Sequence, residues 1–149
     1  MQIGWRLRRF AFRLFKVRTR GAKAMVFNGE GELLLIRNSY GRSHLWVLPG
    51  GGIGRRESPQ DAAAREVKEE TGLAVRELRF LSVHANEGEG KRDTIHLFAA
   101  QADGAPNADA FEVDEAKFFA LDRLPATVSK ATLRRIAEYK GGRAPDGRW

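Results

Sequence analysis

The chain has 149 residues, of which 42% are apolar, so it is long enough for one domain with its own core. It has no cysteine, which excludes disulfides, thiol nucleophiles and zinc sites built on cysteine. No run approaches the roughly eighteen uncharged apolar residues that a membrane-spanning helix needs. We therefore expect a cytoplasmic protein without a transmembrane helix.

The formal net charge of +7 is concentrated at the N-terminus. Residues 1–23 carry eight basic and no acidic side chains, whereas the rest of the chain carries 18 basic and 19 acidic ones. The body of the chain is thus nearly neutral. For this reason we expect no specific nucleic-acid binding by the domain, despite the high isoelectric point.

Residues 1–20 are predicted to form a basic, amphipathic N-terminal extension. Its apolar residues recur in steps of four and three, the period of a helix, at Ile3, Leu7, Phe10, Leu14 and Val17. Arginines run through the middle of the segment, which is not typical of a signal peptide. Three interpretations stay open. The helix packs on its own domain or on a second copy in a homodimer, it lies on the anionic inner face of a membrane, or it contacts single-stranded nucleic acid.

After residue 20 the pattern becomes typical of strands. Two apolar runs, 22–27 and 32–37, flank Asn-Gly-Glu-Gly, which predicts a β-hairpin. We expect further strands at 45–49, 75–85, 94–101 and 111–121, a polar loop at 86–93, a helix at 131–140 and a loose tail at 143–149. Strands mixed with a few helices indicate an α/β or α+β sandwich.

A helix is predicted from Pro59 to Glu70 or Thr71. Ser58 is a good N-cap, proline suits the first helical position, and Asp61 follows the cap by three residues, as in a capping box. Gly72 is a natural C-terminal stop.

This helix gathers its acidic residues on one side. At about 100° per residue, Glu66, Glu69 and Glu70 lie close together, and Lys68 lies on the opposite side and cannot neutralise them. A solvated helix face would normally alternate acidic and basic residues. Carboxylates without Cys or His are the ligands of a hard cation such as Mg²⁺, or Mn²⁺ in its place, which indicates phosphate chemistry.

Residues 51–73 match the pattern Gly-x5-Glu-x7-Arg-Glu-U-x-Glu-Glu-x-Gly-U, in which U is a bulky apolar residue. The matching positions are Gly51, Glu57, Arg65, Glu66, Val67, Glu69, Glu70, Gly72 and Leu73. This stretch resembles the signature box of the Nudix hydrolases, and the flanks at 46–51 and 118–125 resemble segments of that family too. The resemblance implies a Nudix domain over residues 21–142, folded as an α/β/α sandwich around a mixed β-sheet.

The resemblance also implies roles for individual residues. Glu66 and Glu70 would be metal ligands, Glu69 a ligand or a water-orienting group, and the backbone carbonyl of Gly50 would complete the set. Glycines at 50, 51 and 52 would let the backbone approach the metal and the substrate, where a Cβ would intrude.

Five residues outside this ligand set are candidates for supporting roles. The resemblance implies that Arg65 and Glu57 form an ion pair that orients the ligands. It implies a remote carboxylate as an extra ligand or general base, for which Glu112 is the first candidate and Glu115 the second. Arg37 ends a strand that should lead toward the site, where its side chain could bind a phosphate.

We therefore expect a divalent-metal-dependent hydrolase that cleaves a phosphoanhydride bond in a nucleoside diphosphate linked to another group. Its partner would be that small-molecule substrate. The alternative is a non-catalytic module of the same fold that binds a nucleotide or a sugar nucleotide. No proline occurs near Glu89 and no tyrosine between Leu73 and Tyr139, which argues against two branches of the family, those cleaving ADP-ribose and dinucleoside polyphosphates.

Overall fold

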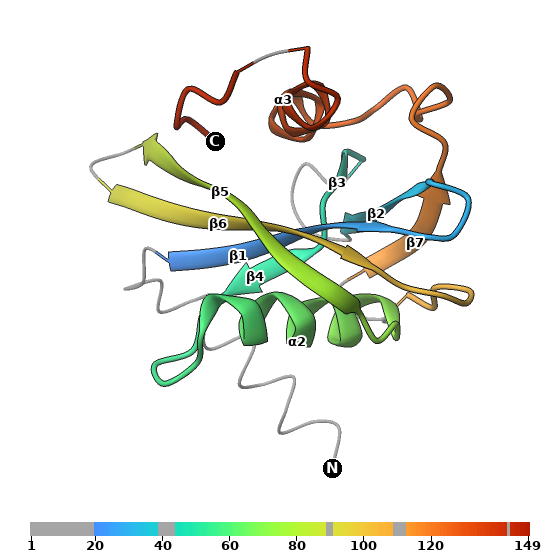
Figure 1. Cartoon of the computed structure of the whole chain (residues 1–149), viewed down its shortest axis with the longest axis horizontal. Helices are drawn as coiled ribbons and strands as arrows, with labels where there is room; N and C mark the ends of the chain where they lie inside the picture. Colours follow the sequence, from blue (N-terminus) through green and yellow to red (C-terminus); the bar gives the residue numbers. More distant parts are fainter. Residues whose placement is uncertain (1–19, 39–43, 89–90, 109–112, 143) are drawn as a thin grey trace.

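The structure is a computed structural model that describes residues 20–38, 44–88, 91–108, 113–142 and 144–149. The N-terminal extension therefore lies outside the described residues, apart from Arg20. The elements in chain order are β1 (Arg20–Phe27), β2 (Leu33–Asn38), β3 (Trp46–Val47), β4 (Gly50–Gly52), α2 (Pro59–Thr71), β5 (Arg76–Gly88), β6 (Lys91–Gln101), β7 (Val113–Phe119) and α3 (Lys130–Tyr139) (Figure 1).

In the described part of the chain, seven strands form one mixed sheet. Its main order is β3-β2-β1-β6-β5, with β4 paired to β1 and β7 paired to β2. The β1–β6 pair is parallel and the other pairs are antiparallel. The two helices cover opposite faces of this sheet (Figure 1). This arrangement confirms the expected α/β/α sandwich around a mixed sheet.

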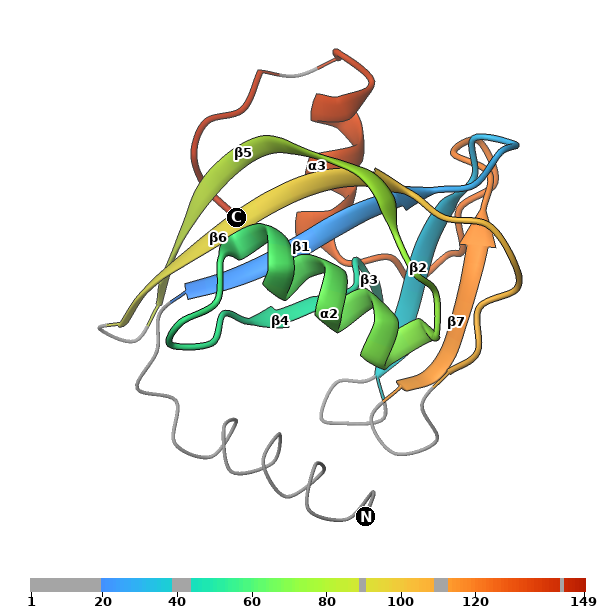
Figure 2. The same cartoon turned by 60° about the horizontal axis from the view of Figure 1, so that its bottom comes forward.

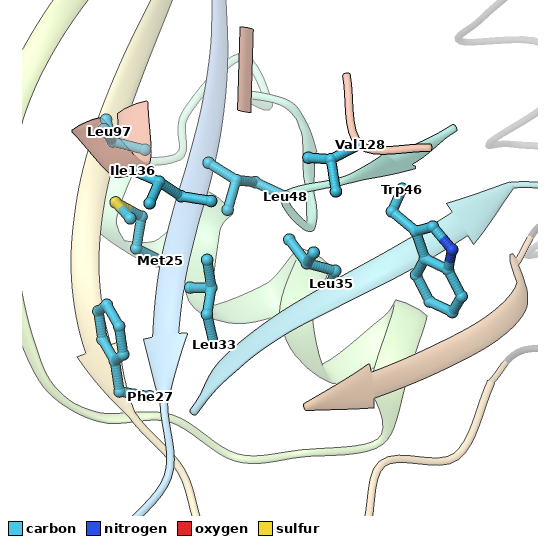
Figure 3. Close-up of a cluster of buried hydrophobic side chains, with 9 residues drawn as sticks. All are labelled: Met25, Phe27, Leu33, Leu35, Trp46, Leu48, Leu97, Val128 and Ile136. Atoms are coloured by element: carbon cyan, nitrogen blue, oxygen red, sulfur yellow. The ribbon is translucent and has the colours of Figure 1, made fainter. Parts of the chain in front are cut away.

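Strand β1 contributes side chains to the packing on both faces of the sheet, because successive strand residues point to opposite faces. Ala24 and Val26 pack with Val67 of α2. Met25 and Phe27 pack on the other side with Ile136 of α3, in the larger buried cluster that Figure 3 shows. Every side chain of β1 from Ala24 to Phe27 is buried, so the strand is the centre of the fold.

The predicted hairpin between β1 and β2 is confirmed. Phe27 pairs with Leu33, and the Asn28 side-chain oxygen accepts hydrogen bonds from the backbone N–H groups of Glu30 and Glu32 at 3.1 and 2.9 Å. Gly31 adopts φ 74°, a left-handed conformation that glycine enters without strain. The turn is thus fixed by Asn28 and Gly31 within it, which is why the sequence alone predicts it.

The polar loop expected at 86–93 is wrong. Strands β5 and β6 continue through Gly88 and Lys91, with Asn86 paired to Asp93. In the described part of the chain β1 pairs with β6 from Arg20 and Thr94 onward, and β5 and β6 continue to pair with each other beyond that position. Backbone pairing does not depend on side-chain polarity, so a run of polar residues can still form paired strands.

The C-terminal tail, expected to be loose, packs along β5. The N–H of Ala85 donates to the carbonyl of Gly147 at 2.7 Å, and the N–H of Trp149 donates to the carbonyl of Ala85 at 3.1 Å. An edge strand offers such unpaired backbone groups, and the tail takes them. Trp149 also packs against the buried cluster on the α3 side. No helix among the described residues is long and apolar enough to cross a membrane.

Candidate active site

Helix α2 begins and ends where the sequence predicts. The N–H of Asp61 donates to the Ser58 hydroxyl oxygen at 3.1 Å, which caps the first turn. Gly72 adopts φ 77° and its N–H donates to the Lys68 carbonyl at 2.9 Å, which closes the last turn. These caps fix the rotation of the helix, and with it the direction in which its glutamates point.

The acidic side of α2 faces the sheet rather than solvent. Glu70 is 1% exposed and Glu66 is 5% exposed. A Glu70 carboxylate oxygen accepts a hydrogen bond from the backbone N–H of Gly50 at 2.8 Å. Figure 2 shows α2 lying across β4 and β1. Since buried carboxylates are costly without compensation, their position beside the glycine strand calls for a functional explanation.

Gly51 is required by this close approach. A Cβ on Gly51 would lie 2.5 Å from the carboxylate carbon of Glu66, well inside van der Waals contact. A Cβ on Gly50 would lie 2.3 Å from the carbonyl oxygen of Ala22 on β1. Both positions therefore require glycine, Gly51 because the Glu66 carboxylate lies against it and Gly50 because β1 does.

Arg65 connects the acidic residues. Its guanidinium forms a two-pronged ion pair with Glu57, at 2.7 and 2.9 Å, and also contacts Glu66 at 2.9 Å and Glu69 at 3.2 Å. It donates a further hydrogen bond to the carbonyl of Gly52 at 3.0 Å. One arginine thus ties the loop before α2, the helix and the glycine strand together.

The charges in this cluster stabilise one another. The Arg65 guanidinium, through its hydrogen bonds, holds the pKa of the Glu57 carboxyl below its usual value, and the N–H of Gly54 adds to this at 2.9 Å. The hydrogen bond to Glu57 in turn raises the pKa of Arg65, with the charges of Glu66 and Glu69 contributing. Glu57 and Arg65 therefore stay ionised at any pH near neutrality.

The donor atoms beside the glycine strand fit a divalent cation by their chemistry. Carboxylate oxygens and backbone carbonyls are the ligands of hard cations. In the described residues, however, no three acidic, histidine or cysteine side chains converge into a ready-made metal cluster. Glu66 and Glu69 are both bonded to Arg65, so a cation would compete with the guanidinium for these carboxylates. These residues could hold a divalent cation, and binding would require the cation to displace the Arg65 guanidinium from the two carboxylates.

The remaining candidate site residues are Arg37, Glu115 and Glu112. Arg37 on β2 and Glu115 on β7 pair with each other at 2.6 Å, on a partly exposed surface. The structure thus brings two candidates together that the sequence treated separately. Glu112, the first candidate for a remote carboxylate, lies outside the described residues.

Two features of the structure are absent from the sequence-based prediction. Lys23 of β1 lies beside Gly50 of β4, and a network joins His84, Arg135 and Glu138 under the C-terminal segment. The position of Lys23 could have been noticed, because a lysine inside an otherwise apolar strand is unusual. The network gives no local signal in the sequence, because its members are up to 54 positions apart.

Comparison with known proteins agrees with this geometry. The family model of the NUDIX domain matches residues 17–139. The chain is 32% identical over 125 residues to the "Putative 8-oxo-dGTP diphosphatase" of Bacillus subtilis (strain 168), covering 83% of this chain and 81% of that protein. It is 31% identical over 133 residues to the RNA pyrophosphohydrolase of Bartonella clarridgeiae, covering 70% and 77%.

Among solved structures, the MutT NUDIX hydrolase from Burkholderia pseudomallei superimposes with a TM-score of 0.70 at 27% identity, covering 79% of this chain and 95% of that one. With a family model across most of the chain and relatives matched over most of their length, the chain belongs to the Nudix family. It is an enzyme of the Nudix hydrolase class.

Proposed function

We propose that this protein hydrolyses a phosphoanhydride bond in a nucleoside diphosphate linked to another group. The observation that carries the proposal is the placement of Glu66 and Glu70, almost fully buried, against two glycines of β4. Packing alone does not require carboxylates there, since apolar residues of similar size would fill the same space at lower cost. A site for a cation and phosphate groups accounts for them.

In this proposal Glu66 and Glu70 hold a divalent cation, with Glu69 and the backbone carbonyl of Gly50 as further ligands. The expected ion is Mg²⁺, with Mn²⁺ as a substitute. When bound, such an ion would neutralise phosphate charge and lower the pKa of a coordinated water. Glu70 is held beside β4 by the Gly50 N–H, which donates to one of its carboxylate oxygens at 2.8 Å.

Arg65 and Glu57 act as positioning residues. The two-pronged ion pair holds the guanidinium in one orientation, and the guanidinium in turn holds Glu66 and Glu69. When a cation binds Glu66 and Glu69, the ion pair with Glu57 still compensates the charge of the Arg65 guanidinium. The proton acceptor for the attacking water is proposed to be Glu69 or Glu112, with Glu115 as the second candidate among the remote carboxylates.

The names of two relatives support the proposed substrate class. They are a putative 8-oxo-dGTP diphosphatase and an RNA pyrophosphohydrolase. The same bond type is proposed here, and Gly51 and Gly52 are proposed to lie along the phosphates. The competing proposal, a module that binds a nucleotide without cleaving it, retains the fold but gives no reason for three glutamates bonded to one arginine and a fourth, Glu70, buried against β4.

The test is phosphate and nucleotide release from a panel of nucleoside triphosphates, sugar nucleotides, dinucleotides, CDP-alcohols and 5′-triphosphorylated RNA, with Mg²⁺ or Mn²⁺. Glu70→Gln should lower turnover at least about 100-fold, because an electrostatic ligand is lost. The fold should survive, since glutamine can still accept the Gly50 hydrogen bond. Glu138→Gln, which changes a buried helix carboxylate elsewhere, is the matched control. Near-normal turnover in Glu70→Gln would remove this residue from the site.

No cleavage of any substrate, combined with a thermal shift on nucleotide addition, would favour the binding module. The N-terminal extension, the cytoplasmic location and a homodimer stay predictions. Co-sedimentation with anionic vesicles, with and without residues 1–19, tests membrane contact. Equal pelleting of both forms would exclude a role of the extension in membrane binding.

A further inference from the structure

Two large apolar side chains of the edge strand β5 are exposed on the α2 face of the sheet. Phe80 is 56% exposed and Val83 is 43% exposed. Phe80 pairs with Phe98 of β6, and their rings lie 5.9 Å apart in an edge-to-face contact. Phe98 is buried in the cluster to which α2 contributes two alanines, which places Phe80 on the same face, beyond the helix.

The surface around these two residues carries no charged side chain. It forms a strip over β5 and β6, which we call the uncharged strip and which consists of Phe80, Val83, Ala85, Thr94 and His96. These residues share the α2 face because cross-strand partners lie on one face and His96 pairs with Ala22, a member of the α2 cluster. Burial, followed by the charge of Arg20, lowers the pKa of His96, so its imidazole is neutral near pH 7. A contiguous surface of this kind is typical of a binding surface.

The N-terminal extension joins the domain at the end of the uncharged strip. Arg20, the first residue of β1, is the partner of Thr94, and Thr94 is the partner of Ala85. At about 4.8 Å between neighbouring strands, Arg20 lies about 10 Å from β5. Residues 1–19 would span about 28 Å as a helix. The extension is therefore long enough to reach Val83 and Phe80 from its point of attachment.

The sequence of the extension complements the uncharged strip. Its apolar residues recur at the helical period, and its basic residues fill the remaining positions. Such a helix is stable in water only where its apolar side is covered. A surface without charges can cover that side while the arginines stay in solvent. Because the extension is tethered beside the strip, its effective concentration there is on the order of millimolar, which favours it over a second copy of the chain.

We propose that residues 3–17 bind the uncharged strip as an amphipathic helix, with their apolar side on Phe80 and Val83. The docked helix forms an additional element on the α2 face. It lies next to the loop that follows β4, because the Arg20 carbonyl accepts a hydrogen bond from the N–H of Ile53 at 3.1 Å. In this arrangement the apolar side of the extension is not available to a membrane or to a second copy. The docking does not depend on the proposed hydrolysis.

Hydrogen exchange of the full-length chain, followed by mass spectrometry of peptides from residues 1–19, tests the proposal. In the wild type these amides should exchange at least about tenfold more slowly than in an unstructured chain. Phe80→Lys combined with Val83→Lys should remove this protection. Leu133→Lys is the control, because Leu133 is 44% exposed on α3, on the opposite face, and its replacement should leave the protection unchanged. Circular dichroism checks that all variants fold. Absence of protection in the wild type, or equal protection in all variants, would overturn the proposal.

Thiol labelling gives a second readout from the side of the strip. The chain has no cysteine, so Val83→Cys introduces a single thiol. Its reaction with a water-soluble maleimide should become at least about fivefold faster when Leu7→Ser and Leu14→Ser are added, since these changes weaken the apolar side of the extension. Leu133→Cys, the control, should react equally fast in both backgrounds. Equal rates for Val83→Cys in the two backgrounds would contradict the docking.

Two further outcomes would assign the extension to another partner. Protection that falls on dilution, together with a dimer in analytical ultracentrifugation, would show that it binds a second copy. Protection that arises only on addition of anionic vesicles would show that it binds a membrane surface. Either result would overturn the proposal, whereas protection that is independent of concentration and present without vesicles supports it.

Discussion

The two faces of the sheet bury charge in different ways. On the α2 face, one guanidinium, that of Arg65, is shared among Glu57, Glu66 and Glu69. On the α3 face, Arg135 forms an ion pair with one carboxylate, Glu138, at 2.8 Å. Both arginines also donate to a backbone carbonyl, Gly52 in one case and Arg148 in the other.

The histidine on the α3 face reinforces the difference. The Nδ1 of His84 lies 3.0 Å from the Arg135 guanidinium, which can only donate, and 3.1 Å from the Arg148 carbonyl, which can only accept, and its Nε2 lies 2.7 Å from the Ser82 hydroxyl. Burial, followed by the Arg135 charge, lowers the pKa of His84, so the ring is neutral near pH 7. The α3 network therefore pairs one cation with one anion and serves the fold, whereas the α2 cluster gathers anions around one cation, which suits the binding of a further cation.

The largest expected effect breaks the α3 network. Arg135→Met leaves Glu138 buried without its guanidinium and removes the hydrogen bond to the Arg148 carbonyl, so the free energy of unfolding should fall by about 3–5 kcal/mol. Urea unfolding followed by circular dichroism measures it. Glu138→Gln keeps an acceptor for Arg135 and should cost less. A loss below about 1 kcal/mol in Arg135→Met would contradict a structural role.

The next effect belongs to the α2 cluster. Glu57→Gln removes the charge that orients Arg65, and turnover should fall about 10–100-fold, as for other residues that support metal ligands. The free energy of unfolding should change by no more than about 1 kcal/mol, because the pair is partly exposed. Parallel turnover and urea measurements check both. Glu32→Gln, in the β1–β2 hairpin, is the control, and equal turnover in the two variants would remove Glu57 from the site.

A smaller effect depends on pH and distinguishes the two faces again. The folded-state pKa of His84 lies below its unfolded value of about 6.5, so the unfolded state binds more protons in acid. The stabilising contribution of neutral His84 is complete above about pH 6.5 and is lost as pH falls toward the folded pKa, at up to about 1.4 kcal/mol per pH unit. His84→Gln should flatten the slope of unfolding free energy between pH 7 and 5. His96, whose pKa is also lowered by burial, remains in both proteins, so an identical slope would exclude His84.

The smallest effect concerns the exposed pair of Arg37 and Glu115. Breaking it should change stability by less than about 0.5 kcal/mol, since both side chains are partly exposed to solvent. If Arg37 binds a phosphate, Arg37→Gln should raise KM about threefold or more while Glu115→Gln does not. Arg76→Gln breaks a comparable exposed pair with Asp103 and serves as the control. The same KM in Arg37→Gln and Arg76→Gln would remove Arg37 from the substrate site.

Local rules were sufficient for the part of the site that lies on one helix. Ser58, Gly72 and the helical period fix α2 and the direction of its glutamates, and the hairpin turn at Asn28 is equally local. The position of Lys23 beside Gly50 was missed because it depends on strand order, which no short-range pattern encodes. The ribbon of β5 and β6 was mistaken for a loop because polarity was used to predict it, although backbone pairing alone holds it together.

The most direct test of the central claim is Mn²⁺ binding by the folded protein, measured as loss of the free-ion signal in electron paramagnetic resonance. We expect binding by the wild type and by Glu138→Gln, and binding at least about tenfold weaker in Glu66→Gln and Glu70→Gln, since each loses a charged oxygen ligand. Such a result would assign the cation to the α2 face. Equal Mn²⁺ affinity in all four proteins would contradict the account, because the buried carboxylates would then have no part in holding a metal.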